Sequence, residues 1–319
     1  MRALICGISG QDGAYLAQHL LARGYEVYGT SRDAQTTTFG SLQLLGIRGQ
    51  IETLSMSPVD FRSVLQTLTR VHPDEVYNLS GQSSVGLSFE QPVEAFESIS
   101  VGTLNLMEAI RFAAPGVRFY NAGSGEVFGD TGETPADENT RLAPKSPYAV
   151  AKATAQWTVA SYREAYKLHG CTGILFNHES PLRPERFVTR KIVAAACAIK
   201  NGDKRRLRLG NIDIVRDWGW APEYVTAMHL MLQQATPADY VIASGRSFSL
   251  REFVGLVFSE LGLNWPDHVD IDPTLLRPSD HLIAKANPRR VAESLGWSAK
   301  YHLPDVVHMM VRSELERQT

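Results

Sequence analysis

The chain of 319 residues is 44% hydrophobic and 21% charged, which is typical of a globular protein and excludes a disordered or fibrous chain. Its 32 Lys and Arg are offset by 34 Asp and Glu, so it lacks the basic surplus that drives sequence-independent binding to nucleic acid. We therefore expect no nucleic-acid partner.

The first 31 residues predict a strand, a glycine turn, a helix and a second strand. Residues 3–6 are apolar, Leu16 and Leu20 lie at helical spacing, and YEVYGTS follows as the second strand. Together they form a βαβ unit. Further helices are expected at 61–71, 95–113 and 147–168, with strands between them. This alternation predicts a doubly wound α/β fold of the Rossmann type, built on a parallel sheet.

The pattern changes after Asn177. The prolyl, basic stretch HESPLRPERFVTRK precedes a helix expected at 192–201 and a charged run at 204–208 that we expect to be a solvated loop. YVIASG at 240–245 is typical of one more strand of the main sheet. We therefore expect a dinucleotide-binding domain of residues 1–176 with a return segment 210–245, and a smaller mixed substrate domain of residues 177–209 and 246–319.

The cysteines and the apolar runs limit where the protein acts. Cys6, Cys171 and Cys197 are widely spaced, form no CxxC pair and adjoin no histidine cluster, so we expect reduced core residues and no metal site. No stretch of 18 apolar residues occurs, which predicts no membrane partner. We expect a cytoplasmic protein.

Three glycines, Gly7, Gly10 and Gly13, follow the first strand as GxxGxxG. In this position they let the backbone approach a pyrophosphate at the positive end of the helix, although a tight turn without a ligand has the same pattern. The second strand ends in two hydroxyl residues and Arg32, where NAD-binding proteins commonly carry an acid for the ribose. This ending favours NADP.

Tyr148 and Lys152 are one helical turn apart, so both can reach one site. An ammonium beside the tyrosine, together with a nicotinamide cation, could lower its pKa from about 10 and make it a base. Ser124 and Glu126 follow the strand VRFYNAG at the carboxyl edge of the sheet, where a hydroxyl can bind substrate and a carboxylate can move a carbon-bound proton. The alternatives are a surface Tyr/Lys pair and an exposed loop acid.

Scattered basic residues predict a second diphosphate site. Lys191, Arg216 and Arg277 are far apart in the sequence, and two of them lie in the mixed segments VTRK and VRDWGW. The alternative for Arg216 is a buried ion pair with Asp217.

Several motifs carry a resemblance to a known family; they are GISGQDGAYLA, NLSGQSSVGLSFEQP, SPYAVAK, GILFNHESP, FVTRK, LGNIDIVRDWG and DYVIASG. In this order they resemble the motifs of the GDP-mannose 4,6-dehydratases, which are extended short-chain dehydrogenases/reductases. The resemblance covers nearly the whole chain. It implies bound NADP, a GDP-sugar substrate and a 4-keto-6-deoxy product, formed by internal hydride transfer.

The resemblance also implies roles for individual residues. The catalytic group would be Ser124, Glu126, Tyr148 and Lys152. The cofactor would contact the last two and Gly7, Gly10, Gln11, Asp12, Gly13, Arg32, Leu79, Ser80 and Gln82. The substrate would contact Ser83, Asn177, Glu179, Val188, Lys191, Arg216, Arg277 and Asp280. The helices at 95–113 and 147–168 would pair with their copies in a homodimer or homotetramer, where Met107, Ile110, Trp157 and Tyr166 could be interfacial as well as core.

Four departures from the family pattern stand out. Gly125 replaces a polar side chain beside the expected leaving hydroxyl, and Pro184 replaces a glycine near the sugar, so we expect room for GDP-manno-heptose as well as GDP-mannose. A single Arg32 and the pair Ser55–Met56 change the cofactor loops. The alternatives in function are a GDP-4-keto-sugar reductase or epimerase, and a silent NADP-binding scaffold.

Overall fold

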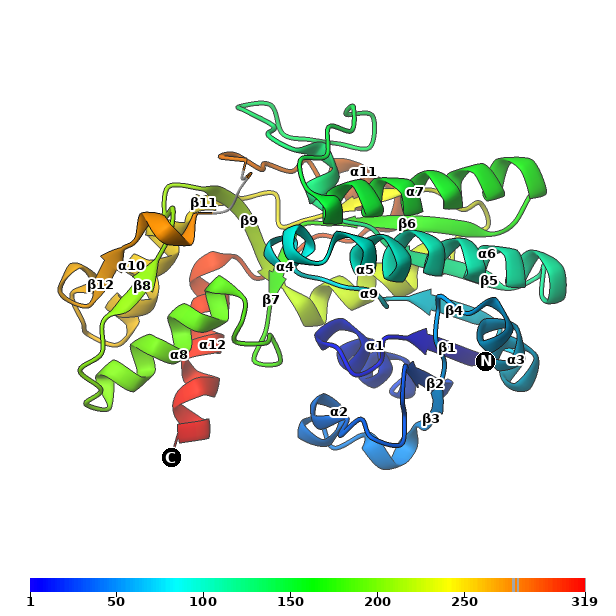
Figure 1. The fold of residues 1–319 in the computed structure, drawn as a ribbon, viewed down its shortest axis with the longest axis horizontal. Helices are drawn as coiled ribbons and strands as arrows, with labels where there is room; N and C mark the ends of the chain where they lie inside the picture. The colour runs from blue at the N-terminus through cyan, green and yellow to red at the C-terminus, as the bar shows by residue number, and fades with distance from the viewer. Residues whose placement is uncertain (277–278, 280, 319) are drawn as a thin grey trace.

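The structure is a computed structural model that describes residues 1–276, 279 and 281–318. Its main element is a seven-stranded sheet in the order β10-β6-β5-β4-β1-β2-β3, and every pairing in it is parallel (Figure 1). This confirms the predicted doubly wound α/β fold. The strands are β1 (Arg2–Cys6), β2 (Glu26–Ser31), β3 (Glu52–Ser55), β4 (Glu75–Asn78), β5 (Arg118–Ala122), β6 (Gly170–Leu175) and β10 (Tyr240–Ile242).

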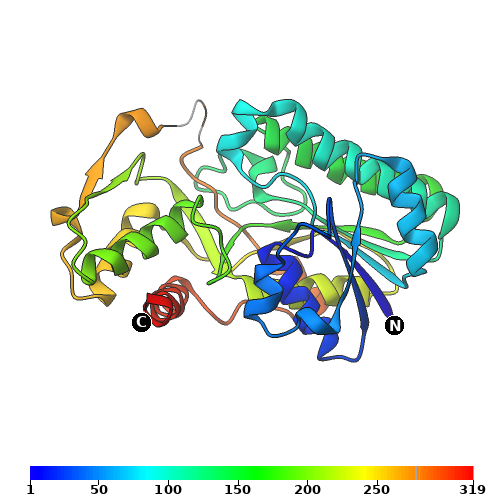
Figure 2. The same cartoon turned by 60° about the horizontal axis from the view of Figure 1, so that its bottom comes forward.

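Helices cover both faces of this sheet, and each face has its own apolar core (Figures 1 and 2). One face carries α1 (Gln11–Leu21), α2 (Gly40–Leu44), α9 (Ala221–Leu232) and α11 (Arg289–Leu295). The other carries α3 (Phe61–Val71), α4 (Val85–Glu90), α5 (Pro92–Phe96), α6 (Gly102–Ala113) and α7 (Pro147–Tyr166). Short 3-10 turns lie at Arg48–Gln50, Gly125–Phe128 (η3), Trp265–Asp267 and Pro273–Leu275.

The helix expected at 95–113 is interrupted. A π-helical segment, Glu97–Val101, joins α5 to α6. Two of its serines bond to other segments: Ser98 Oγ accepts from the Gln82 backbone N–H, and Ser100 Oγ donates to the Ala151 carbonyl. These contacts fasten the segment to the loop after β4 and to α7.

A second region lies beside the carboxyl edge of the main sheet (Figure 1). It has a three-stranded sheet and a two-stranded sheet around an apolar core that includes Trp218, Phe253 and Phe258. Its strands are β7 (Asn177–Glu179), β8 (Leu207–Leu209), β9 (Val215–Trp220), β11 (Ser247–Ser249) and β12 (Val269–Ile271). Its helices are α8 (Val188–Lys200), α10 (Leu250–Glu260) and α12 (Leu303–Gln318).

The charged run at 204–208 is not entirely a solvated loop. It leads into β8, whose Leu207 and Leu209 are buried, and the Arg206 and Arg208 guanidinium groups pair with Asp270 and Asp272 of the neighbouring β12 segment. Only the first part of the run is an exposed loop.

The expected return segment 210–245 is shared between the two regions. Its strand β9 belongs to the three-stranded sheet, whereas α9 and β10 pack in the main sheet region. The division into two domains stays a prediction. In the described part of the chain, no helix is both long and apolar enough to cross a membrane.

Candidate active site

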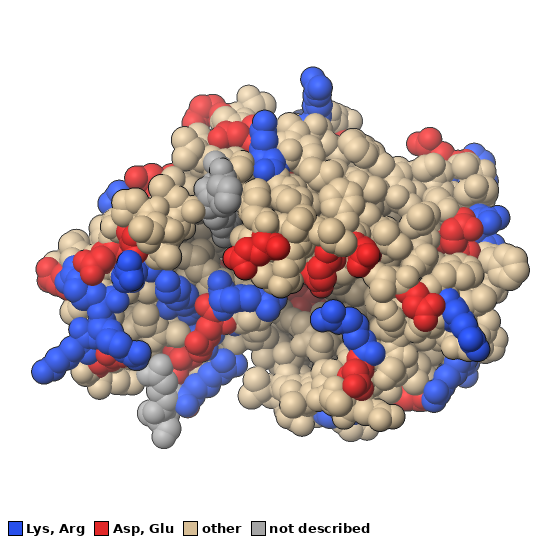
Figure 3. Space-filling model, viewed as in Figure 1, with Lys and Arg blue, Asp and Glu red and all other residues tan. Residues whose placement is uncertain are grey.

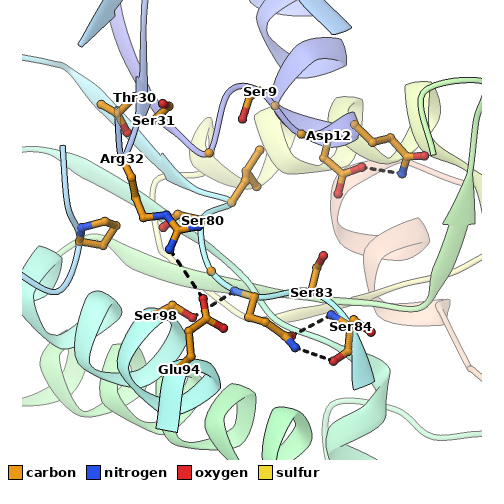
Figure 4. Close-up of a pocket in the computed structure, with 18 of the residues that line it drawn as sticks. Ser9, Asp12, Thr30, Ser31, Arg32, Ser80, Ser83, Ser84, Glu94 and Ser98 are labelled. Atoms are coloured by element: carbon orange, nitrogen blue, oxygen red, sulfur yellow. Dashed lines mark hydrogen bonds and ion pairs between the residues drawn. The ribbon is translucent and has the colours of Figure 1, made fainter. Parts of the chain in front are cut away.

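A cavity of about 830 Å³ opens where β1 and β4 lie side by side and the strand order reverses direction. This is the place where doubly wound sheets bind ligands. The cavity is lined by the turns after β1, β2, β3 and β4 and by Arg183, Pro184, Arg186 and Phe187. Figure 4 shows serine, threonine and charged side chains around it, with Arg32 and Glu94 facing each other. Its size suits a dinucleotide.

The glycine turn between β1 and α1 fits a bound diphosphate. Gly7 has φ +85°, and a Cβ there would lie 2.8 Å from the Leu79 carbonyl oxygen. A Cβ on Gly13 would lie 2.5 Å from the Gly7 carbonyl oxygen, so both glycines are needed for the turn itself. Gly10 is different, because it meets only one atom, at 3.4 Å. It precedes an α1 N-terminus that no side chain caps, which leaves the first N–H groups for an anion.

The two charged residues that follow β2, Arg32 and Asp33, have different surroundings. Asp33 Oδ1 accepts hydrogen bonds from the backbone N–H groups of Gln35 and Thr36, and these bonds lower the pKa of the carboxyl. Its charge is therefore engaged in its own loop. Arg32 lines the cavity, its side chain is 83% exposed, and its guanidinium is 3.9 Å from the Glu94 carboxylate.

The loop after β4 contributes Leu79, Ser80, Gln82 and Ser83 to the cavity wall. Two of these side chains are used within the loop. The Ser80 hydroxyl donates to Asn78 Oδ1 at 2.7 Å, and the Gln82 amide both accepts from and donates to the Ser84 backbone. These bonds fix the shape of the wall.

A second cavity of about 220 Å³ adjoins the first and shares part of its lining, including Asp12 and Arg186. Ser124, Glu126, Tyr148 and Lys152 all line it. Two elements bring them together: the turn η3 after β5 and the first turns of α7. The predicted catalytic group therefore lies in one place.

Tyr148 and Lys152 are both buried, so the surface-pair alternative is wrong. Lys152 Nζ donates to the Ala122 carbonyl at 2.7 Å and lies 5.8 Å from the centre of the Tyr148 ring. Burial raises the pKa of Tyr148 to about 12, against a smaller lowering by the Ser124 hydroxyl. Burial also lowers the pKa of Lys152 to about 8. The expected lowering of the tyrosine pKa by Lys152 is therefore not found in the protein alone.

Glu126 follows Ser124 in η3 and is not an exposed loop acid. The Ser124 hydroxyl accepts a hydrogen bond from the Glu126 backbone N–H at 3.3 Å. The Glu126 side chain is 19% exposed, and its Oε1 lies 3.6 Å from Nε2 of His281.

Gly125 does not open space beside the sugar, which corrects the expectation drawn from the sequence. A Cβ on this residue would lie 2.9 Å from the ring of Phe176, which is itself buried. The ring fills the volume that a side chain would take. Pro184 lines the first cavity and is absent from the described lining of the second. The expectation that the site accepts GDP-manno-heptose as well as GDP-mannose stays a prediction.

A buried ion pair joins α1 to β7. His178 Nε2 lies 2.9 Å from Asp12 Oδ2, and its Nδ1 lies 2.7 Å from the Phe176 carbonyl oxygen. Both partners accept hydrogen bonds, so both ring nitrogens carry protons. Although burial opposes the charge, the Asp12 carboxylate raises the pKa of His178. In turn, the imidazolium outweighs burial and lowers the pKa of Asp12.

Five of the predicted substrate residues line the second cavity: Ser83, Asn177, Glu179, Val188 and Arg216. Ser83 lines both cavities. Lys191 lines neither, because its ammonium donates to the Arg208 carbonyl at 2.8 Å on the exposed side of α8. Arg277 and Asp280 lie outside the described residues.

Arg216 is buried, and its guanidinium donates to the carbonyl oxygens of Val215, Leu282 and His281. Neighbouring residues of a strand point to opposite faces, and the Asp217 carboxylate accepts from the Ser244 backbone N–H. The proposed alternative, an ion pair between Arg216 and Asp217, thus finds no support in these contacts.

Sequence reasoning missed two basic residues, Arg183 and Arg186, which line both cavities. The Arg183 guanidinium lies 3.8 Å from the centre of the Phe187 ring. The basic, prolyl composition of residues 178–191 was the only signal for them. Figure 3 shows more Lys and Arg on the lobe of α8 and β8, beside the hollow that separates it from the main sheet.

Comparisons with known proteins agree with this geometry. The family model described as GDP-mannose 4,6 dehydratase matches residues 4–310. The chain is 44% identical over 326 residues to GDP-mannose 4,6 dehydratase 1 of Arabidopsis thaliana, covering 98% of this chain and 90% of the relative.

Two solved structures share the fold. UDP-glucose 4-epimerase of Thermus thermophilus, in complex with NAD, has a TM-score of 0.87 and 25% identity, covering 98% of this chain and 99% of the other. RMD of Pseudomonas aeruginosa, complexed with NADPH, has a TM-score of 0.81 and 22% identity, covering 99% of each chain.

Proposed function

The chain belongs to the GDP-mannose 4,6-dehydratase family and is an enzyme that dehydrates GDP-mannose, and from this premise we propose how its residues divide the reaction. The observation that carries the proposal is the meeting of Ser124, Glu126, Tyr148 and Lys152 in the second cavity, which shares part of its lining with the first. The first cavity would hold a nicotinamide dinucleotide and the second the sugar.

Tyr148 acts as the base for the sugar 4-hydroxyl, with Ser124 binding the same hydroxyl. Lys152 supplies positive charge at the buried end of α7. A bound dinucleotide would supply the hydride acceptor and then the donor, and its oxidised form would add a positive ring to the site. That added charge is needed, because burial alone holds the pKa of Tyr148 at about 12.

Glu126 carries out the elimination. Once C4 is a ketone, the C5 proton is acidic, and the Glu126 carboxylate takes it while the bond between C6 and its hydroxyl breaks. Gly125 offers no side-chain acid, so Glu126 also returns the proton to the departing hydroxyl, which leaves as water. Return of the hydride to C6, with protonation of C5 by a proton that Glu126 takes from solvent while Tyr148 releases its own, would then complete the 4-keto-6-deoxy sugar.

The cofactor is NADP in this proposal. Arg32 lines the cavity at the end of β2, where a 2′-phosphate would lie, and the Asp33 carboxylate is engaged by backbone N–H groups. A free carboxylate would favour the ribose hydroxyl of NAD. Arg32→Ala should weaken NADP binding and leave NAD binding nearly unchanged, as measured by calorimetry.

The GDP end of the substrate would contact Asn177, Glu179, Val188 and Arg216, to which we add Arg186. Contacts of Lys191, Arg277 and Asp280 with the substrate stay predictions. Lys191 would have to leave its bond to the Arg208 carbonyl in order to reach a phosphate.

A homodimer is also proposed. Apolar side chains lie exposed along one side of α5, α6 and α7, among them Phe112 (74%) and Trp157 (60%). Tyr166 is exposed as well, whereas Met107 and Ile110 are buried in the core of the single chain and cannot be interfacial. An exposed apolar surface on packed helices favours pairing with a second copy.

The variant Glu126→Gln tests the role of Glu126 in the elimination. A neutral amide cannot take the C5 proton, so the variant should bind GDP-mannose and NADP as the wild type does but should form no dehydrated product by mass spectrometry. Retention of near-normal dehydration by the variant would overturn the role of Glu126.

A further inference from the structure

A buried histidine, His281, lies beside the carboxylate of Glu126, the residue assigned to the elimination. His281 Nε2 is 3.6 Å from Glu126 Oε1, and the His281 side chain is 4% exposed. The histidine is absent from the described lining of the second cavity, whereas Glu126 is part of it. An imidazole in this place can act on the carboxylate without touching the sugar.

The fold holds His281 there through its neighbours in the chain. The Leu282 backbone N–H donates to Asp130 Oδ2 at 2.9 Å, and the Thr131 N–H donates to the Ile283 carbonyl at 2.9 Å, which ties the segment to the loop that follows η3. On its other side, the Val215 N–H donates to the Leu282 carbonyl at 2.7 Å. The histidine is thus fastened to the loop that continues from Glu126.

Charged groups of both signs surround the buried imidazole of His281. The Glu126 carboxylate lies 3.6 Å from the imidazole. Burial raises the pKa of Asp130, but the backbone hydrogen bonds of its loop and the charge of His281 together lower it. The Arg216 guanidinium donates to the His281 carbonyl oxygen at 3.0 Å. From α7, Tyr148 is close enough to Glu126 for the carboxylate to raise the pKa of the tyrosine, in addition to the larger effect of burial. The two carboxylates stabilise an imidazolium, whereas burial and the Arg216 guanidinium oppose it.

We propose that His281, as an imidazolium, is a positioning residue that holds the Glu126 carboxylate and keeps it ionised for removal of the C5 proton. The inference rests on the base role proposed for Glu126. A separation of 3.6 Å is that of an ion pair, and such contacts commonly shorten when substrate is bound. Gly125, the next residue in the chain, carries no side chain that could hold the carboxylate instead.

The test compares the pH dependence of kcat for dehydration in the wild type and in His281→Gln and His281→Arg. Loss of a cation about 4 Å away makes a carboxylate harder to ionise, so His281→Gln should move the acidic limb about one unit to higher pH and lower kcat about tenfold below it. KM should stay within about threefold. His281→Arg restores the charge and should return the limb toward its wild-type position.

His308 offers a matched control, because its Nδ1 lies 2.7 Å from Glu260 Oε1 on an exposed surface. His308→Gln should leave the limb where it is. A limb that stays in place in both His281→Gln and His308→Gln, with activity otherwise reduced, would overturn the inference and leave His281 a structural residue.

A second measurement does not depend on the folding of His281 variants. The imidazole of His281 can be titrated by NMR in the wild type and in Glu126→Gln, where loss of the carboxylate should move its titration to lower pH. An unchanged titration would contradict the pairing. Dehydration by Glu126→Gln would instead refute the proposed function, so the two failures are distinguishable.

Discussion

At the scale of single residues, burial decides the state of the catalytic pair. Tyr148 and Lys152 are nearly inaccessible, and burial moves both pKa values toward the neutral forms. The ammonium, with a pKa of about 8, keeps its charge at neutral pH and loses it above that value. The pair therefore works only over a limited range of pH.

This predicts an alkaline limb that belongs to Lys152. A lowered pKa means that the charge is present below about pH 8 and lost above it, so the rate of dehydration should fall as the pH rises through that value. Steady-state rates from pH 6 to about 10 would show it. Lys152→Met should be slow throughout and lack this limb, and persistence of the same limb in that variant would assign it to another group.

Gly125 provides a second prediction at this scale. Gly125→Ala places a methyl group 2.9 Å from the Phe176 ring, and such overpacking costs about 1–3 kcal/mol. Urea unfolding should show this loss. Gly255, inside α10, has no atom within 4 Å of its Cβ position, so Gly255→Ala should instead stabilise by about 0.5–1 kcal/mol. Unchanged stability of Gly125→Ala would mean that the ring moves freely.

At the scale of elements, the ion pair between Asp12 and His178 joins the cofactor turn to the strand that carries Asn177 and Glu179. Removing one partner of a buried pair is costly, because the other charge stays buried alone. The pair therefore couples the position of β7 to that of α1.

We expect Asp12→Asn and His178→Gln each to destabilise the protein by roughly 3 kcal/mol, and the double variant by much less than their sum. Additive effects in unfolding experiments would show that the residues do not interact. The exposed pair Arg289–Glu293 should contribute under about 1 kcal/mol to the free energy of unfolding.

The stability that the buried pair provides also depends on pH. The pKa of His178 is raised, so its contribution to stability is lost as the pH rises through the folded pKa. The pKa of Asp12 is lowered, so its contribution to stability is lost in acid.

Much of this arrangement follows from local pattern. The helix predicted at 61–71 matches α3, and the Asp60 side chain that precedes α3 accepts from the Arg62 N–H. Because ligand sites of parallel sheets lie at the carboxyl ends of the strands, the sequence also predicted that Ser124 and Glu126 would lie near Tyr148 and Lys152. Contacts between distant segments were not predictable. The π-helical segment Glu97–Val101 has serines bonded to other elements, and β8 depends on β12.

In the candidate active site, too, the features that the sequence did not predict depend on contacts between distant segments. The sequence placed Lys191 at the substrate, yet its ammonium bonds to the Arg208 carbonyl on a neighbouring strand. The Phe176 ring over Gly125 and the approach of His281 to Glu126 also join parts of the chain that no local pattern relates.

At the scale of the whole molecule, the exposed apolar side of α5, α6 and α7 lies on the sheet face opposite α1 and α2 (Figure 2). It lies away from the cavities, because neither cavity is lined by Phe112 or Trp157. A second copy can cover it without closing the site.

A charged side chain on the exposed apolar side of α5, α6 and α7 should therefore prevent the proposed dimer from forming. Trp157→Glu should shift the protein from dimer to monomer in sedimentation at micromolar concentration, because a carboxylate would be buried at the interface. Leu44→Glu, on the exposed part of α2, is the control and should leave the mass unchanged. A wild-type protein that sediments as a monomer would contradict the dimer.

The central claim is that one site oxidises C4, eliminates water across C5 and C6, and returns the same hydride. GDP-mannose labelled with deuterium at C4 tests it most directly, with NMR and mass spectrometry of the product. We predict a 4-keto-6-deoxy product that carries the deuterium at C6, formed over many turnovers without net consumption of NADPH. Deuterium that accumulates in released NADPH, with C6 of the sugar unlabelled and its hydroxyl retained, would contradict the account.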